Sequence, residues 1–424
     1  MFTDEKIKNG LRAWYRLCPI RHTLILVSAV LIFLHLLTRP FRALNVWLSA
    51  RMVRPAHVWL SEKCARVSFS VAELLIALLV LGLLWYLLHQ LSALFRQPKF
   101  FLRLYRTLTA LLALGLTVYA GFSLLWGVYY YGDDFIAQSG LKNDPVSIRQ
   151  LERVTWYFAD MANTYADRVP RGEDGQYRGD RAALLDKTPE VYRETAALYP
   201  CLDGPERRVK GVFCSRVMSY LDFTGFFFPF TGEANVNTDF PLPLFAATAA
   251  HELAHQRGVA KEQEANFCAV LACLNYGDPE YVYSAALLAY THLGNALHSA
   301  NREAWERIYS RLDESVRADL AAGTAYWAQF NTPVQAASNK VYEGFLQSYD
   351  QRLGLKSYGA CVDMLVNYYL PEADRMPRLD ELYEEEAQKE EAPEESDAPE
   401  ETEAPEETPA PEESEETEET ENNP

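Results

Sequence analysis

The sequence predicts a mainly α-helical membrane protein with three transmembrane helices, a helix-rich domain with little β structure, and a disordered acidic tail. Three observations support this fold class. Long apolar runs fall within residues 23–131, whereas residues 140–371 show helical periodicity interrupted by glycine and proline. Residues 381–424 hold 21 acidic residues and a single lysine, so the rest of the chain is close to neutral although the net charge is −18.

The apolar runs cover residues 23–37, 71–88 and 108–131. A helix of about 20 residues crosses a hydrocarbon core of about 30 Å, so we interpret each run as a membrane span. The first run is the shortest, and a cleaved signal peptide is the alternative for it. We favour an uncleaved span because the following TRPFR offers no small-residue cleavage site. Trp126 and the tyrosines at 129–131 are expected to form an aromatic belt at one interface.

Lysine and arginine residues predict how the spans are oriented. The N-terminal tail, residues 1–22, and the loop between the second and third runs are both basic and share one side of the membrane. The positive-inside rule assigns that side to the cytoplasm, which makes the domain at 140–371 extracytoplasmic. The first loop, residues 38–68, is also basic, and its stretch FRALNVWLSARMV can lie on the membrane as an amphipathic helix. Glu73 is expected either near the headgroups or paired within the helix bundle.

The tail, residues 372–424, is predicted to be disordered. From residue 384 onward it has no aromatic and no large aliphatic side chain, so it cannot bury enough apolar surface to offset its chain entropy. Basic residues form no stripe outside the segments that flank the membrane, so we expect no nucleic-acid partner. The lipid bilayer is the partner that the composition predicts.

Within the domain, Asp144 and Pro145 are expected to begin a helix over 146–165. Residues 168–181 are rich in glycine and arginine and are interpreted as a loop. Residues 231–237 predict a short strand, which is either an edge strand that pairs with an extended peptide or a strand that packs on a helix. From 244 to 370 the chain is expected to be almost wholly helical, with breaks at Gly258, 277–279, 332–333 and Gly354.

The stretch AATAAHELAHQRGVAKEQEANF, residues 246–267, carries the candidate chemistry. Residues four apart share one face of a helix, so His251 and His255 can direct both imidazoles at one zinc ion. Glu252 lies about 100° around the helix, where it can reach a water on that ion instead of the ion itself. Zinc lowers the pKa of such a water, and Glu252 can take its proton as the general base. This HExxH spacing is a metalloprotease signature.

A zinc site of this kind needs a third protein ligand, and two glutamates of the next predicted helix compete for the role. Glu262 is favoured, because Asn266 then shares its face and can hydrogen-bond a ligand histidine. Glu264 is the alternative, on nearly the opposite side of the helix. Gly258 permits the sharp reversal that brings the second helix back over the first. Two histidines and a glutamate would be costly to bury on an alanine-rich helix without a partner, and a metal supplies one.

The pattern His251-Glu252-x-x-His255 followed by Glu262-x-x-Ala265-Asn266 resembles the gluzincin metallopeptidases, whose third ligand is a glutamate followed four positions later by Asp or Asn. The resemblance implies a zincin-like domain with Zn²⁺ as cofactor and a peptide or protein as substrate. The sequence departs from the gluzincin pattern in one respect. Gluzincins usually place many more residues between the second histidine and the ligand glutamate.

A wider resemblance covers most of the chain. The segments FFFPFTGEANVN, HELAHQRGVAKEQEANF, YSAALLAY and NKVYEGFLQSYDQRLGLKSYGACVDMLVNYYL are similar to a bacterial membrane-protein family catalogued only as a domain of unknown function. This resemblance implies a multi-pass protein of the bacterial cytoplasmic membrane with one zincin-like domain. It implies no substrate.

The leading hypothesis is therefore a membrane-anchored zinc metallopeptidase. The alternatives are a zinc-stabilised membrane sensor or scaffold without turnover, and hydrolysis of another amide such as a cell-wall crosslink. Glu252 argues against the first of these, because a structural zinc site needs no base and fills all four positions with protein ligands. Tyr290 or His292 can donate a hydrogen bond to the oxyanion of the reaction, although each is also explained as an ordinary residue of a helix surface.

Overall fold

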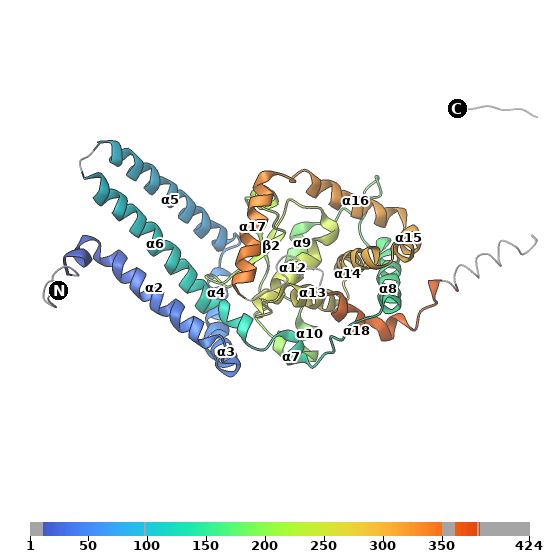
Figure 1. The fold of residues 1–424 in the computed structure, drawn as a ribbon. Coiled ribbons are helices and arrows are strands. Elements are labelled where there is room, and N and C mark those ends of the chain that lie inside the picture. The colour runs from blue at the N-terminus through green and yellow to red at the C-terminus, as the bar shows by residue number, and fades with distance from the viewer. Residues whose placement is uncertain (1–11, 97–98, 350–360, 380, 382–424) are drawn as a thin grey trace, which may run out of the picture. The chain divides into compact units, whose positions relative to one another are not determined.

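The computed structural model describes residues 12–96, 99–349, 361–379 and 381 (Figure 1). The described part is mostly helical and contains one small sheet, as the sequence predicts. The chain divides into two compact units, residues 1–377 and 378–424. Most of the predicted disordered tail lies outside the described part, and so does the predicted break at Gly354. The start of that tail is ordered instead, because the last helix runs to Ala373 and Arg153 donates a hydrogen bond to the backbone oxygen of Pro377 at 2.9 Å.

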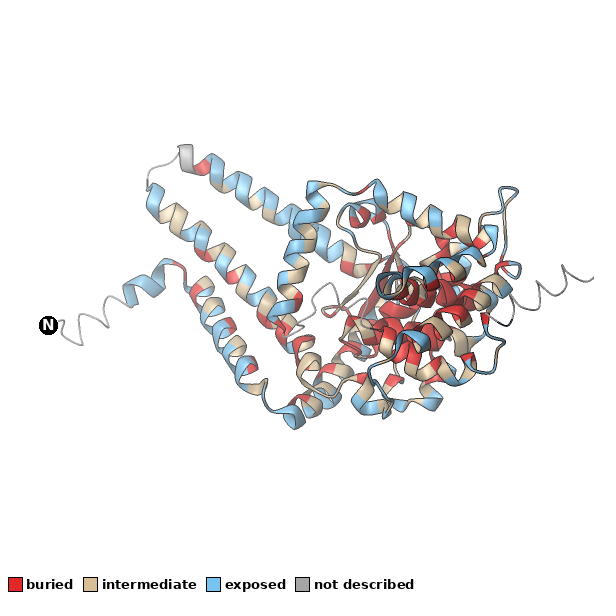
Figure 2. Ribbon diagram, turned by 45° about the vertical axis from the view of Figure 1, so that its right-hand side comes forward, coloured by how far each residue is buried: buried red, intermediate tan, exposed pale blue. Residues whose placement is uncertain are grey.

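Three helices are long and apolar enough to cross a membrane, and they mark the chain as a membrane protein. They are α2 (Pro19–Thr38), α5 (Val71–Arg96) and α6 (Phe100–Leu125). Each contains most of one predicted span. Their apolar side chains are largely exposed along the helices (Figure 2), which suits contact with lipid instead of water.

Trp126, predicted to belong to an aromatic belt at the end of the third span, packs against the domain, whereas the tyrosines at 129–131 are partly buried. Helix α6 ends at Leu125, and Gly127–Tyr131 forms a 3₁₀ turn, η2. Trp126 is buried, with its ring centroid 5.0 Å from that of Phe227 in the domain. Packing against the domain removes more of this indole from water than a place among headgroups would, so tertiary contacts decide its position.

The loop between the first two spans is helical, in agreement with the predicted amphipathic stretch. It consists of α3 (Arg42–Leu48), the π-helical turn η1 (Ser49–Val53) and α4 (Arg54–Cys64). Trp47 and Trp59 are exposed on these helices. Exposed tryptophans beside membrane spans are typical of a segment that lies at the membrane interface.

A buried ion pair attaches the second span to the domain. The carboxylate of Glu233 accepts hydrogen bonds from the backbone N–H groups of Val71 and Ala72, at 3.2 and 2.8 Å, in the first turn of α5. Lys210 donates to the same carboxylate at 2.6 Å. Glu233 thus satisfies backbone donors that a helix N-terminus leaves free, and its charge suits the positive end of the helix dipole.

The domain contains the remaining helices. They are α7 (Phe135–Ser139), α8 (Ile148–Ala166), α9 (Arg181–Lys187), α10 (Arg193–Leu198), α11 (Ser215–Tyr220), α12 (Phe245–Gln256), α13 (Glu262–Tyr276), α14 (Pro279–Ala300), α15 (Arg302–Ser310), α16 (Glu314–Ala328), α17 (Pro333–Ser348) and α18 (Val362–Ala373), with 3₁₀ turns η3 (Pro200–Leu202) and η4 (Leu242–Leu244). The most buried residues lie where α8, α12, α13 and α14 pack together (Figure 2).

Several predicted helix boundaries are confirmed and others are corrected. The breaks at Gly258, 277–279 and 332–333 are present. The helix predicted over 146–165 is α8, which begins three residues after Pro145 because Ser147 and Gln150 form a reciprocal capping box. The sequence did not predict the break at Asn301. The side chain of Asn301 accepts a hydrogen bond from the backbone N–H of Ala304 in the first turn of α15.

The sheet has three strands, β1 (Lys210–Val212), β2 (Gly225–Phe228) and β3 (Glu233–Asn237), in the order β1-β3-β2. Strand β3 pairs in parallel with β1 and antiparallel with β2. The predicted strand at 231–237 exists, but it is the central strand and not an edge. Every residue of β3 is buried, and burial requires its backbone groups to be paired on both sides. Strand β2 is an edge strand, and β2 and β3 pack on α12.

Candidate metal centre

Helix α12 positions the two histidines of the HELAH motif. It follows the proline-bounded turn η4 and consists largely of alanine, which lets neighbouring elements approach closely on all sides. It ends at Gln256, and Gly258 has a φ of +92°, a conformation that favours glycine. A Cβ atom at Gly258 would also lie 2.7 Å from the ring of Tyr129. The chain reverses at this glycine and enters α13 at Glu262, so a short connection brings the second helix over the first.

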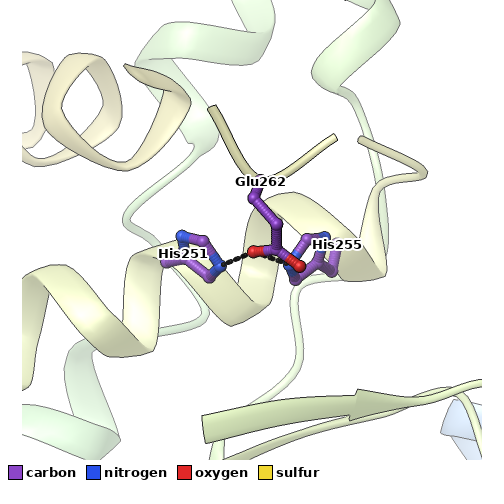
Figure 3. Close-up of side chains that lie close together, drawn as sticks. All are labelled: His251, His255 and Glu262. Atoms are coloured by element: carbon purple, nitrogen blue, oxygen red, sulfur yellow. Dashed lines mark ion pairs between the residues drawn. The ribbon is translucent and has the colours of Figure 1, made fainter. Parts of the chain in front are cut away.

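His251, His255 and Glu262 converge in space (Figure 3). The Nε2 atoms of His251 and His255 lie 3.2 and 3.5 Å from Oε2 of Glu262, and the three potential ligand atoms all lie within 4.8 Å of one another. Two ligands at 2.0–2.1 Å from a tetrahedral zinc ion are separated by about 3.4 Å. The spacing of the three side chains therefore suits one ion between them.

The outer nitrogens of both histidines are fixed by hydrogen bonds. His255 Nδ1 lies 2.6 Å from the backbone oxygen of Val259, and His251 Nδ1 lies 2.9 Å from Oδ1 of Asn266. A carbonyl oxygen only accepts, so Nδ1 of His255 carries a proton and donates. Its Nε2 then faces the Glu262 carboxylate either as a second N–H or as a bare lone pair. A lone pair facing a carboxylate needs a cation between them, which is the arrangement of a metal ligand.

Electrostatics in the cluster favour bound positive charge. Burial disfavours the charged forms of all three groups, but their mutual attraction outweighs it at two of them. The two imidazoles hold the pKa of Glu262 well below its usual range, and Glu262 raises the pKa of His255 to about 9. The pKa of His251 is lowered by burial. A divalent cation can replace the proton that His255 and Glu262 otherwise share.

Glu252 stands beside the cluster without joining it. The residue is buried, and its Oε2 atom has no hydrogen-bond partner among the described residues. Burial raises the pKa of Glu252 to about 8. The backbone of β2 lies close to this carboxylate. A Cβ atom at Gly225 would be only 2.5 Å from Oε1 of Glu252. An unpaired buried carboxylate is costly, so Glu252 is a candidate for a chemical role beside the cluster.

The alternative ligand Glu264 points away from the histidines. Its Oε2 atom accepts a hydrogen bond from the backbone N–H of Phe135 at 2.8 Å, and Lys261 lies 3.9 Å from its other oxygen. Burial raises the pKa of Glu264 to about 7. The structure thus brings Glu262 to the histidines and holds Glu264 on the far side of α13.

Tyr342 is a site residue that the sequence did not reveal. Its hydroxyl donates a hydrogen bond to Oε1 of Glu262 at 2.8 Å, which leaves Oε2 facing the histidines. Tyr342 lies on α17, 80 residues beyond Glu262 and outside any motif. Only the fold brings α17 next to α13, so no local sequence signal indicates this contact.

A cavity of about 550 Å³ opens beside the cluster. His251, Glu252, His255 and Glu262 all line it, and so does His292. Burial and the nearby His251 lower the pKa of His292 to about 4, which leaves its imidazole neutral at pH 7. Of the two predicted oxyanion donors, His292 is therefore the one placed at the site.

Tyr290 lies elsewhere. It lines a separate cavity of about 340 Å³, which is bounded by α14, α15 and α16. Residues two apart project from a helix in directions about 200° apart, so Tyr290 and His292 cannot both face the cluster.

The donor set fits zinc. Two imidazole nitrogens and one carboxylate oxygen form a three-ligand set, and zinc sites that perform catalysis keep their fourth position open. The cavity beside the cluster gives a substrate or water room to approach these three ligands. The fold and the site together define a membrane-anchored helical domain with a two-histidine, one-glutamate cluster beside an unpaired carboxylate.

Comparison with known families places the chain more closely. Residues 54–366 match the model of a family described as "Protein of unknown function (DUF3810)", and the chain belongs to this family. The matched region includes α5, α6 and the whole cluster. No curated protein and no solved structure matches the chain. The family description confirms the resemblance to a domain of unknown function and carries no activity.

Proposed function

We propose that the protein is a membrane-anchored zinc metallopeptidase that hydrolyses peptide bonds. The observation that carries the proposal is the convergence of His251, His255 and Glu262 beside the unpaired carboxylate of Glu252, at the wall of a cavity. The HExxH spacing and the similarity to gluzincins support it. The short segment between His255 and Glu262 departs from gluzincins, and the reversal at Gly258 accounts for how it still closes the cluster.

Each side chain has a definite task in this proposal. His251, His255 and Glu262 hold the ion, which when bound polarises the substrate carbonyl and lowers the pKa of a coordinated water. Glu252 accepts a proton from the attacking water and delivers it to the leaving amine, so that water and one amide yield a carboxylic acid and an amine. The imidazole N–H of His292 donates to the carbonyl oxygen as negative charge develops there.

Strand β2 offers a way to hold the substrate. It is an edge of the sheet, and its residues Gly225, Phe226 and Phe227 line the cavity beside Glu252. An extended peptide can add to a free strand edge through main-chain hydrogen bonds, which carry no sequence requirement. The peptide would then pass the cluster with its carbonyl groups near the ion.

The proposed location is the outer face of the bacterial cytoplasmic membrane, on the basis of the lysine and arginine distribution. The alternative of a zinc-stabilised sensor or scaffold makes a different chemical demand. A structural zinc site uses four protein ligands, whereas only three converge here within the described residues. The cavity beside the cluster is also unnecessary for a purely structural ion.

The test uses the full-length protein purified in detergent and loaded with zinc. Wild type is expected to retain about one zinc per chain and to cut a mixed peptide library, as judged by elemental analysis and mass spectrometry. Glu252→Gln should keep the zinc and lose roughly 10²- to 10⁴-fold in kcat/KM, because a general base contributes about that much. Zinc without any cleavage by wild type would favour the scaffold instead.

Two glutamates on α13 provide matched controls for the metal. Glu262→Gln should weaken zinc binding by at least about 10-fold, since it removes a charged ligand. Glu264→Gln, two residues away but directed at Phe135, should leave both zinc content and cleavage close to wild type. Equal zinc loss in the two variants, or full activity in Glu252→Gln, would contradict the proposed roles.

A further inference from the structure

The third membrane span forms part of the wall of the candidate active site. Phe122 in the last turn of α6, then Trp126 and Tyr130 just beyond it, line the same cavity as the histidines. The ring centroid of Trp126 lies 5.8 Å from that of His255 and 5.0 Å from that of Phe227 on strand β2. Only the side chain of Trp126 therefore separates His255 from the end of a membrane helix.

The cavity wall continues onto a surface suited to lipid. Helix α17 closes the cavity beside Phe122, where the rings of Phe122 and Phe345 are 5.1 Å apart. On α6 itself, Val118 lies one turn before Phe122 on the same face and is exposed. A chain that leaves the cluster along Phe122 thus passes from the cavity onto the apolar surface of a membrane span.

A second contact independently places the domain at the same membrane boundary. Glu73, in the first turn of α5, accepts hydrogen bonds from the backbone N–H groups of Phe213 and Cys214 at 2.8 and 2.7 Å. Helices α5 and α6 are antiparallel neighbours, so the start of α5 and the end of α6 lie on one side of the membrane. Phe213 is 94% exposed beside that boundary, as an aromatic side chain inserted among lipid headgroups would be.

We propose that the cavity receives the juxtamembrane segment of a second polypeptide that is itself anchored in the membrane. This inference rests on the proposed peptidase function and names its substrate class. From Phe122 to Trp126 a helix rises about 6 Å, and an extended chain covers about 3.3 Å per residue. With the 5.8 Å between the ring centroids of Trp126 and His255, the total is about 12 Å, so a substrate needs only about four extended residues between the end of its own span and the bond that is cut.

Membrane anchoring also favours a substrate that is held in the same bilayer. Two proteins confined to one bilayer meet at a high effective concentration, which raises the rate without any new contact. The apolar wall formed by Phe122 and Phe345 then suits the first residues that emerge from a substrate's span. A soluble peptide would contact the same apolar wall without the high effective concentration that the bilayer provides.

Three probes test the inference with wild-type protein in phosphatidylcholine proteoliposomes. The first is a single-span helix followed directly by a randomised 16-residue polar segment. The second has the same span and segment separated by 30 Gly/Ser residues, so it shares the local concentration but not the geometry. The third is the segment alone in solution. Initial rates and cut positions are measured by mass spectrometry, with Glu252→Gln as the background.

The direct probe should be cut at least about 10-fold faster than both others, with cuts concentrated within roughly eight residues of the span. Equal rates for the direct and spaced probes would overturn the inference, because they would show that proximity to the bilayer alone matters. Equal or faster cutting of the soluble segment would overturn it while leaving the peptidase function intact. Absence of cleavage of all three probes would overturn both.

Discussion

Gly225 sets the position of the proposed base. The backbone of β2 lies so close to Glu252 that a methyl group at this residue would meet three atoms of the carboxylate side chain within 2.8 Å. Glu252 stands on α12 beside His251, and the three atoms nearest to a methyl group at Gly225 all belong to Glu252. Strand β2 therefore contacts the proposed base directly, and its effect on that base can be measured apart from zinc binding.

We expect Gly225→Ala to lower kcat/KM by about 10²-fold, because a displacement of about 1 Å at a catalytic group costs that much. Zinc content should stay at the wild-type level, as measured by elemental analysis. Gly323→Ala is the matched control, since nothing lies within 4 Å of a Cβ atom built there. A parallel loss of zinc in Gly225→Ala would show that the strand supports the cluster as a whole and not the base.

At the scale of elements, α4 connects the membrane-flanking region to the domain through a buried histidine. His57 on α4 is buried, and its ring packs edge-on against Phe227 with centroids 5.2 Å apart. Its backbone oxygen would lie 2.6 Å from a Cβ atom at Gly232, where φ is +67°. Burial lowers the pKa of His57 to about 4.

This buried histidine predicts a pH-dependent stability. Between about pH 6.5 and 4, His57 is protonated in the unfolded chain but stays neutral in the folded protein. The free energy of unfolding therefore falls as the pH drops from about 6.5 to about 4. The loss is roughly 3 kcal/mol and is complete below that range. Denaturant unfolding in detergent should show a loss that is roughly 3 kcal/mol smaller in His57→Phe than in wild type, because His292 contributes its own loss in both proteins.

The exposed His298 provides the control for this measurement. His298→Phe should keep the wild-type dependence of the free energy of unfolding on pH between 4 and 6.5. If wild type and His57→Phe lose stability in parallel over that range, the protonation of His57 does not govern it.

At the scale of the whole molecule, the membrane region and the domain share one site. Residues before 140 supply Trp126 against His255, and they supply the backbone N–H of Phe135 to Glu264. Residues 1–377, which include both the membrane spans and the domain, form a single compact unit, and only the tail is separate. A fragment confined to 140–424 would keep every candidate ligand and lose one wall of the cavity.

We therefore expect the 140–424 fragment to unfold at least roughly 10 °C below the full-length protein, since loss of a buried tryptophan contact costs about 3–5 kcal/mol. Its zinc affinity should fall as well. Thermal unfolding and zinc titration in the same detergent measure both effects. A chain that ends at residue 381 should match the full-length protein, and equal unfolding temperatures for the 140–424 fragment and the full chain would refute the shared site.

Local patterns in the sequence predicted the three spans, most helix breaks and the helix that carries His251, Glu252 and His255. These features depend on hydropathy, on glycine and proline, and on residues one helical turn apart, all of which act within a few positions of the chain. The hydrogen bond that His251 donates to Oδ1 of Asn266 was predicted for the same reason, because α13 follows α12 after one short turn.

The tertiary structure alone decided between Glu262 and Glu264, between His292 and Tyr290, and between the centre and the edge of the sheet. It also revealed Tyr342 and the wall formed by Trp126. In each case the deciding partner lies far away in sequence, and its position depends on how whole helices and strands pack. Periodicity states which side chains share a face, but only the packed fold determines what that face meets.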